Sequence, residues 1–198
     1  MAKRMGVLVS LTLAGGWAAT AQAQVATGPW TSYSPSYSIQ ERGCGDVNGS
    51  SFYLTCSTAD GDQRAERRYA TYTSGTRQFE GYLKVVSLGG TRISVKQTFK
   101  ESPAGPWFIM AVENGGRLYN VTGTQTTIGS SCVGCTTRVN TVHYLGSAKV
   151  VVYLNGSQKF TQYGGEGSAW YDKFGAYRTS SGKGPATISW TNVRFWRK

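Results

Sequence analysis

Short runs of alternating apolar and polar residues follow one another along most of the chain. Alternation with a period of two is typical of β-strands, because successive side chains of a strand point to opposite faces. Gly, Asn and Ser separate the runs, and no segment has the apolar period of a long helix. The pattern predicts strands at Arg67–Tyr72, Gln78–Val86, Arg92–Phe99, Trp107–Val112, Leu118–Val121, Val139–Leu145, Lys149–Leu154, Trp170–Tyr177 and Thr187–Trp196.

Many short strands in one chain predict two stacked sheets, that is, an all-β sandwich or jelly roll. Asn155-Gly156 directly follows a predicted strand and favours a tight hairpin, because type I′ turns need positive φ at both central residues. Leu88-Gly89-Gly90 is a second expected turn. The stretch Val25–Ser38, rich in Ser, Tyr and Pro, is expected to be an irregular arm that wraps the domain.

Residues 1–23 have the pattern of a secretory signal peptide. A basic start precedes the apolar run Val7–Ala14, and Ala21-Gln22-Ala23 matches the A-x-A pattern of a cleavage site. The apolar run is too short to span a bilayer, and no later stretch is long and apolar enough. We therefore expect a secreted, extracellular protein in which residues 24–198 form a single domain.

The four cysteines are expected to form two disulfides in the oxidising environment that a secreted protein meets. Among three possible arrangements, sequence proximity favours Cys44 with Cys56 and Cys132 with Cys135. The alternative for the close pair is a zinc site. Zinc needs further ligands, whereas the chain has one histidine, His143, and no second close-spaced cysteine pair.

The formal charge of the chain is +11, and removal of Lys3 and Arg4 with the leader lowers it to +9. A strongly basic secreted protein favours an anionic partner, such as an acidic polysaccharide, a membrane surface or nucleic acid. The charged residues form no basic tail, which argues against a simple electrostatic tether. A basic surface that serves only solubility is the alternative.

The segment YDKFGAY, from Tyr171 to Tyr177, carries the most reactive set of side chains. As a strand it places Tyr171, Lys173, Gly175 and Tyr177 on one face, while two apolar residues of the other face can enter a core. A lysine beside a tyrosine is a plausible proton-transfer pair, because a nearby cation favours the phenolate and lowers its pKa. The alternative is an ordinary amphipathic strand with aromatic residues at the sheet surface.

Alternate residues of the segment RAERR form a charged row if the segment is a strand: Arg64, Glu66 and Arg68. Two arginines that flank a glutamate hold each other in place, and one guanidinium can remain free to bind a ligand carboxylate through two hydrogen bonds. The alternative is a surface salt-bridge ladder, which is common and contributes little energy.

The segment SVKQTF places a glutamine among apolar neighbours. A period of two puts Val95, Gln97 and Phe99 on one face. Burying an unpaired amide is costly, so such a glutamine has a defined hydrogen-bonding task. Gln97 is expected either to bind a substrate carboxylate or to bond to the backbone.

The segments RAERR, KQTF and YDKFGAY resemble, in order and spacing, the signature segments of the alginate-lyase-type jelly rolls. These are the enzymes of polysaccharide lyase family 7 and their glucuronan-lyase relatives, with the pattern R-x-E-x-R, Q-x-H and Y-x-K-x-G-x-Y. The resemblance covers the chain from about Arg64 to Trp196. It implies a concanavalin A-like β-jelly roll of two antiparallel sheets with a concave substrate groove. It also implies β-elimination at a uronic acid, with no metal and no cofactor.

The resemblance further implies roles for single residues. Arg64 and Gln97 would neutralise the substrate carboxylate, and Tyr177 would be the catalytic tyrosine with Lys173 beside it. Neutralising the carboxylate acidifies the neighbouring C5 proton and stabilises the developing enolate-like charge. The further substrate-binding candidates are Glu66, Arg68, Tyr171 and His143. The expected partner is an anionic polyuronate, not nucleic acid or a membrane, and the expected state is a monomer.

One departure from the family pattern bears on activity, because Phe99 stands where the family has the histidine of Q-x-H. One possibility is that Tyr177 serves as both base and acid. The alternative is a carbohydrate-binding jelly roll that still binds the polysaccharide but no longer cleaves it. For such a binding protein, the candidate sugar-stacking aromatics are Trp107, Tyr119, Tyr163 and Trp170.

Two further functions fit the sequence less well. A glycoside hydrolase needs two suitably spaced carboxylic acids, and only Glu66 among the acidic residues is placed on the expected groove face. The positive charge would permit nucleic-acid binding, but the sequence contains no known nucleic-acid-binding module.

Overall fold

The structure is a computed structural model, and it describes residues 25–26, 28–57, 62–179 and 182–198. The predicted signal peptide, residues 1–23, lies outside the described residues, so its assignment stays a prediction. Within the described part of the chain, no helix is long and apolar enough to cross a membrane.

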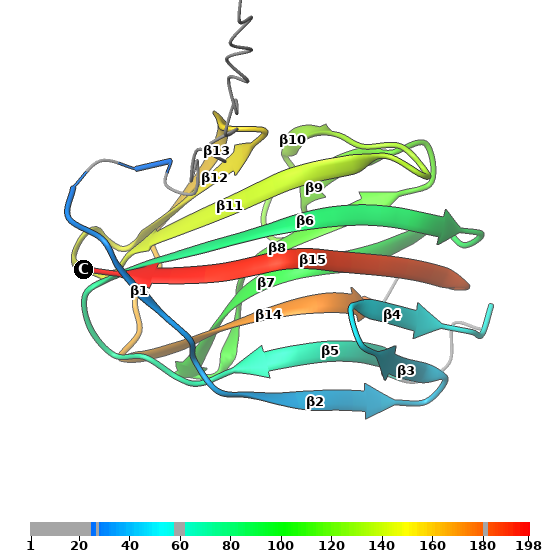
Figure 1. Cartoon of the computed structure of the whole chain (residues 1–198), viewed down its shortest axis with the longest axis horizontal. Helices are drawn as coiled ribbons and strands as arrows, with labels where there is room; N and C mark the ends of the chain where they lie inside the picture. The colour runs from blue at the N-terminus through cyan, green and yellow to red at the C-terminus, as the bar shows by residue number, and fades with distance from the viewer. Residues whose placement is uncertain (1–24, 27, 58–61, 180–181) are drawn as a thin grey trace, which may run out of the picture.

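Two antiparallel β-sheets are stacked face to face (Figure 1). Sheet A has the order β13-β12-β11-β6-β15-β4-β3, with β1 paired to the end of β15. Sheet B has the order β10-β9-β8-β7-β14-β5-β2. The strands of sheet A are β1 (Thr31–Tyr33), β3 (Gly45–Asn48), β4 (Ser51–Leu54), β6 (Thr76–Leu88), β11 (Thr136–Tyr144), β12 (Lys149–Leu154), β13 (Ser157–Tyr163) and β15 (Ala186–Arg197). The strands of sheet B are β2 (Tyr37–Arg42), β5 (Arg64–Tyr69), β7 (Arg92–Ser102), β8 (Gly105–Glu113), β9 (Arg117–Asn120), β10 (Thr127–Ser130) and β14 (Ala169–Tyr177).

This architecture confirms the predicted all-β jelly roll of two stacked sheets. Every strand predicted from the alternation is present, with ends that differ by a few residues, and η1 (Leu145–Ser147) is a single turn of 3-10 helix. The prediction of an irregular arm over Val25–Ser38 is wrong in part. β1 and the start of β2 form there, because Tyr33 pairs with Phe195 and Tyr37 pairs with Tyr69.

The predicted hairpin and cysteine pairs are present. The residues of Asn155-Gly156 have φ values of 51° and 84°, as a type I′ turn requires. Cys44 is paired with Cys56 and Cys132 with Cys135, with Cα atoms 5.8 Å and 5.1 Å apart. These distances lie in the usual range for disulfides.

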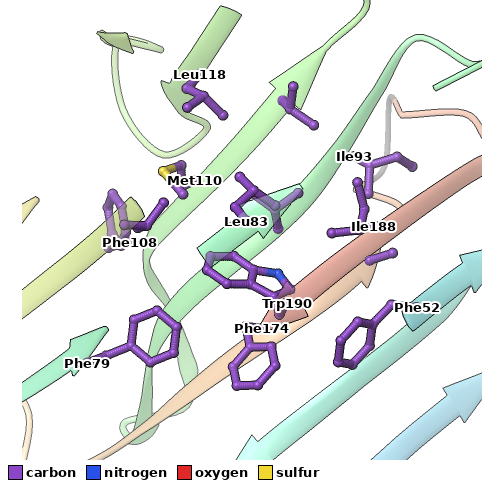
Figure 2. Packing of buried hydrophobic residues seen from close by; sticks show 14 of the residues in the cluster. Phe52, Phe79, Leu83, Ile93, Phe108, Met110, Leu118, Phe174, Ile188 and Trp190 are labelled. Atoms are coloured by element: carbon purple, nitrogen blue, oxygen red, sulfur yellow. The ribbon is translucent and has the colours of Figure 1, made fainter. Parts of the chain in front are cut away.

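The core between the sheets is rich in aromatic side chains (Figure 2). Phe79 of β6, Phe174 of β14 and Trp190 of β15 pack against one another with ring centroids 5.4 to 5.6 Å apart. Burying one large apolar side chain contributes about 1.5–3 kcal/mol. Because Phe174 and Ala176 are buried in this core, the residues that alternate with them on β14 must point to the outer face of sheet B.

Candidate active site

A cleft of about 380 Å³ lies on the outer face of sheet B, over the adjacent strands β7, β14 and β5. This hollow is named the cleft. Its lining includes Arg64, Gln97, Phe99, Tyr171, Lys173 and Tyr177. The three segments that the sequence analysis singled out therefore meet in one hollow.

The register of the strands brings these residues together. Lys173 of β14 lies opposite Gln97 of β7 on one side and opposite Arg68 of β5 on the other. Tyr177 lies opposite Arg64. Side chains at paired positions share a face and lie close together, so the pairing alone creates a row of cations beside a phenol.

Two local features adjust this register. Gly175 has a φ of 145°, and a Cβ atom there would lie 2.2 Å from the carbonyl oxygen of Ala65, so only glycine lets β14 approach β5 this closely. The prediction that Val95 shares a face with Gln97 is wrong. The pairing of β7 with β8 shifts register at this point, and Val95 joins the core between the sheets.

Glu66 lies beneath the cleft and is 2% exposed. Gln97 Nε2 donates a hydrogen bond to Glu66 Oε1 at 2.5 Å, and Lys173 Nζ donates one to Oε2 at 3.4 Å. Burial raises the pKa of Glu66, while the cations of Lys173 and Arg64 oppose this shift. The structure does not support direct substrate binding by Glu66, because both oxygens already have partners and little of the residue is accessible. Glu66 instead holds Gln97 and Lys173 in place.

Arg64 and Tyr177 share a carboxylate, Asp62. Arg64 Nη2 lies 2.5 Å from Asp62 Oδ2, and Arg42 Nη1 lies 3.0 Å from the same oxygen. The Arg64 guanidinium lies 4.9 Å from the centroid of the Tyr177 ring. Burial raises the pKa of Tyr177, and Asp62 raises it further, while Arg64 opposes the shift. This corrects the expectation that a neighbouring lysine lowers the pKa of this phenol, which is therefore protonated at neutral pH.

One wall of the cleft is a stacked aromatic pair. The ring centroids of Phe99 and Tyr171 lie 5.1 Å apart, with the rings 19° from parallel. Arg68 lies 4.0 Å from the Tyr171 centroid and binds Glu101 at 2.6 Å. Burial lowers the pKa of Lys173, whose Nζ lies 5.9 Å from both ring centroids. Phe99 thus contributes an apolar ring to this wall, at the position where the Q-x-H pattern of the alginate-lyase-type jelly rolls has a titratable histidine.

His143 lies in β11 of sheet A and is 2% exposed. Its ring centroid lies 4.7 Å from that of Trp170 and 5.0 Å from that of Trp107, and its Nδ1 lies 3.0 Å from the Tyr72 hydroxyl oxygen. Burial lowers the pKa of His143 to about 4. The structure therefore does not support His143 as a substrate-binding residue, because it is a neutral imidazole packed in the interior.

The candidate sugar-stacking aromatics are also mostly interior. Trp107, Tyr119 and Trp170 are buried, while Tyr163 is 67% exposed. The alternation could not separate core aromatics from surface ones, because both occur at every second position of a strand.

The sequence pattern marked neither Gln40, which lines the cleft, nor Asp62, which binds Arg64 beside it. Extending the row of Arg64, Glu66 and Arg68 back by two residues would have found Asp62, whereas nothing in the sequence marks Gln40. Within the residues that the structure describes, Gln40 Oε1, Asp62 Oδ1 and Arg64 Nε are buried atoms without a hydrogen-bond partner. Unpaired buried polar atoms are costly, and two of these three belong to residues that line the cleft, Gln40 and Arg64.

The cleft thus combines cations, an amide and a phenol, a set suited to binding an anion and moving a proton next to it. Among the described residues, no group of three or more His, Cys, Asp or Glu side chains is placed to hold a metal ion.

No protein-family model matches the sequence. A curated relative, the citrate-binding protein of Hevea brasiliensis, is 28% identical over 128 residues, which are 64% of this chain and 52% of that protein. The chain therefore spans about half the length of this relative.

Solved structures with the same fold include alginate lyases of polysaccharide lyase family 7 and a member of polysaccharide lyase family 18. The family 7 alginate lyase AlyA1 from Zobellia galactanivorans has a TM-score of 0.60 and 20% identity, covering 78% of this chain and 80% of its own. A sialidase has a TM-score of 0.58 and 12% identity, covering 80% of this chain and 16% of its own. At these identities the likeness establishes the jelly-roll fold, and the chemistry has to be argued from the residues of the cleft.

Proposed function

We propose that this protein is a polysaccharide lyase that cleaves a uronic-acid-containing polysaccharide by β-elimination. The observation that carries the proposal is the meeting of Arg64, Gln97, Lys173 and Tyr177 in one cleft on sheet B. The fold that the chain shares with solved alginate lyases supports it. The net positive charge also favours a polyanionic substrate.

The substrate carboxylate binds between Arg64, Gln97 and Lys173 in this proposal. Arg64 lines the cleft and its side chain is 22% exposed, so part of its guanidinium can reach a ligand, and Glu66 fixes the positions of the other two side chains. Hydrogen bonds from these donors stabilise the negative charge that develops on the carboxylate as C5 loses its proton.

Tyr177 carries both proton transfers in a syn elimination. The phenolate oxygen takes the C5 proton, the C5–H electron pair forms the C4–C5 double bond, and the C4–O bond breaks. The phenol then returns the same proton to the departing glycosidic oxygen, which regenerates the phenolate without another reactant. Phe99 supplies no titratable imidazole to the cleft, so in this proposal one tyrosine performs both steps.

Ultraviolet absorbance tests the proposal, because the C4–C5 double bond conjugated with the carboxylate absorbs there. Mature protein is incubated with polymannuronate, polyguluronate, polyglucuronate and a pectic acid, each with and without a chelator. We expect a chelator-resistant rise on at least one polymer, which also identifies the uronate. No rise on any of the four overturns the proposal.

A non-catalytic carbohydrate-binding protein is the second candidate. Two features of the cleft favour it. Phe99 cannot accept a proton, and the raised pKa of Tyr177 leaves little phenolate to act as a base. Polymer binding without any ultraviolet-absorbing product would support this second function.

We further propose that the protein is secreted after loss of residues 1–23 and acts as a monomer. N-terminal sequencing of protein recovered outside the producing cells tests the first statement, with a start near Gln24 as the expected result. Light scattering coupled to size-exclusion chromatography tests the second, and a mass near twice that of the chain would contradict it.

A further inference from the structure

A second hollow, of about 280 Å³, opens at the edge of β15 between β1 and β4. We call it the window. One edge of β15 pairs with β4 over Ala186–Ser189 and with β1 over Phe195–Arg197, which leaves Thr191–Arg194 without a strand partner at this edge. Figure 1 shows β1 and β4 at opposite ends of β15. The volume is near the lower end of the range for ligand pockets.

A bulge in β15 shapes the rim of the window. The pairing of β15 with β6 shifts register between Thr191 and Arg194, and Asn192 has a φ of 50°. Bulges of this kind turn side chains out of the regular alternation. Here Val193, Arg194 and Phe195 line the window in succession, and Arg194 is exposed.

Arg67 supplies a second cation. It lies on the opposite face of β5 from Arg64 and Arg68, with its guanidinium 4.7 Å from the centroid of the Tyr37 ring. Its Nη2 donates a hydrogen bond to the carbonyl oxygen of Gly49 at 2.6 Å, but its Nε is buried and has no hydrogen-bond partner in the described part of the chain. Among the described residues, no carboxylate forms a salt bridge with Arg67 or Arg194. Burying part of a cation without an anion is costly, so this site favours an anionic ligand.

The rest of the lining narrows the class of ligand. Serine and tyrosine residues line the window, and burial raises the pKa of both Tyr33 and Tyr69 to about 12, so these phenols are neutral. The Tyr69 phenol also accepts a hydrogen bond from Arg67. Tyr37 is 50% exposed and offers an aromatic face. Two arginines alone suit any small anion, whereas hydroxyl groups and an aromatic ring match a ligand that also has hydroxyls and a ring.

We propose that the window is a second binding site, separate from the cleft, for an anionic sugar unit of a polysaccharide. The anionic group, a carboxylate or a sulfate, lies between Arg67 and Arg194, and the sugar ring packs against Tyr37. Such a site tethers the polymer to the opposite side of β5 from the cleft. The proposal depends only on the residues of the window, and it stands whether or not the cleft is catalytic.

Calorimetric titration of variants in which the cleft is disabled tests the proposal. The Arg64→Ala/Lys173→Met/Tyr177→Phe protein, which lacks the two cations and the proton carrier of the cleft, is titrated with hexamers of mannuronate, guluronate and glucuronate, with a heparin-derived hexasaccharide, and with neutral maltohexaose. We expect binding of an anionic hexamer but not of maltohexaose, and the preferred hexamer distinguishes carboxylate from sulfate. Adding Arg194→Ala or Tyr37→Ala weakens this binding by about tenfold, the effect of losing one charge-assisted or stacking contact.

Lys159→Ala is the matched control, because it removes one exposed positive charge from β13, at the far edge of sheet A from β15. Thermal melting verifies that each variant is folded, which we expect because Arg194 and Tyr37 are exposed. Unchanged affinity in Arg194→Ala and Tyr37→Ala overturns the proposal, as does an equal loss in Lys159→Ala. A different experiment tests the lyase proposal: that proposal fails if the wild-type protein forms no ultraviolet-absorbing product.

Discussion

Two lysine–carboxylate pairs lie on opposite faces of sheet B, and each includes one residue of β14. On the outer face Lys173 binds Glu66 in the cleft, and on the inner face Lys96 binds Asp172 in the core. The two lysines belong to neighbouring strands, β14 and β7, and burial lowers the pKa of both. Residue type and pKa direction therefore do not distinguish the candidate active site from the interior.

The surroundings of the two pairs differ in access and in free donors. Lys96 is fully buried, its Nζ also donates to the Gln97 carbonyl oxygen at 2.9 Å, and Thr98 Oγ1 donates to Asp172 at 3.1 Å. The inner pair is thus satisfied by its own neighbours. Around the outer pair there is a hollow that the partly exposed Arg64 side chain also lines, and Arg64 Nε has no hydrogen-bond partner among the described residues. A polar cluster becomes a candidate site when a ligand can reach it and donors remain unpaired.

The largest expected effect comes from removing the proton carrier of the cleft. Tyr177→Phe should lower kcat by about a thousandfold while leaving polymer binding within a few fold, because only the hydroxyl is lost. Initial rates of ultraviolet absorbance measure this, and binding is followed by titration. Tyr163→Phe, at an exposed position, is the control. Equal turnover in Tyr177→Phe and wild type would remove this tyrosine from the mechanism.

Breaking the inner pair should chiefly affect stability. Lys96→Met leaves the Asp172 carboxylate buried without its cation and should lower the free energy of unfolding by about 3 kcal/mol. Lys173→Met in the cleft should cost about 1 kcal/mol, since Glu66 keeps a second nearby cation, Arg64, and the hydrogen bond from Gln97. Urea denaturation of the two variants measures the difference. Similar losses in both variants would contradict the distinction between the two pairs.

Removing the proposed carboxylate-binding cation should have a smaller effect than removing the phenol. Arg64→Ala should lower kcat/KM by about a hundredfold, because a charge-assisted contact that strengthens in the transition state is lost. Steady-state kinetics on the preferred polymer measure this. Arg42→Ala, which removes the other cation bound to Asp62, is the control and should change kcat/KM only a few fold. Equal effects of the two changes would argue against a special role for Arg64.

The pH dependence of the reaction should report the raised pKa of Tyr177. A raised pKa means that little phenolate is present near neutral pH, so kcat/KM should rise about tenfold per pH unit between about pH 7 and 9. Asp62→Asn removes the carboxylate that raises this pKa and should move the profile to lower pH. Asp46→Asn, at an exposed position, should leave the profile in place. A flat profile in wild type would identify a different base.

Much of the fold could be predicted from local patterns. The alternation located the long strands, Asn155-Gly156 located a hairpin, and the shared faces of β5 and β14 followed from the period of two. Short or polar strands such as β3 and β13 were missed, because a few residues show too little alternation. The predicted face of Val95 was wrong, because no local sequence pattern indicates the register shift between β7 and β8.

The sequence by itself determined which side chains can act, namely the alternating Arg64, Gln97, Lys173 and Tyr177 on strands far apart in the chain. Only the tertiary structure decided that these four meet in one cleft, that Asp62 joins them, and that the imidazole of His143 lies in the core instead. The physical reason is that alternation fixes the face of a strand on which a side chain lies, whereas strand order and register fix its neighbours. Burial and neighbouring charges, which set the pKa of a group such as Tyr177, depend on those neighbours.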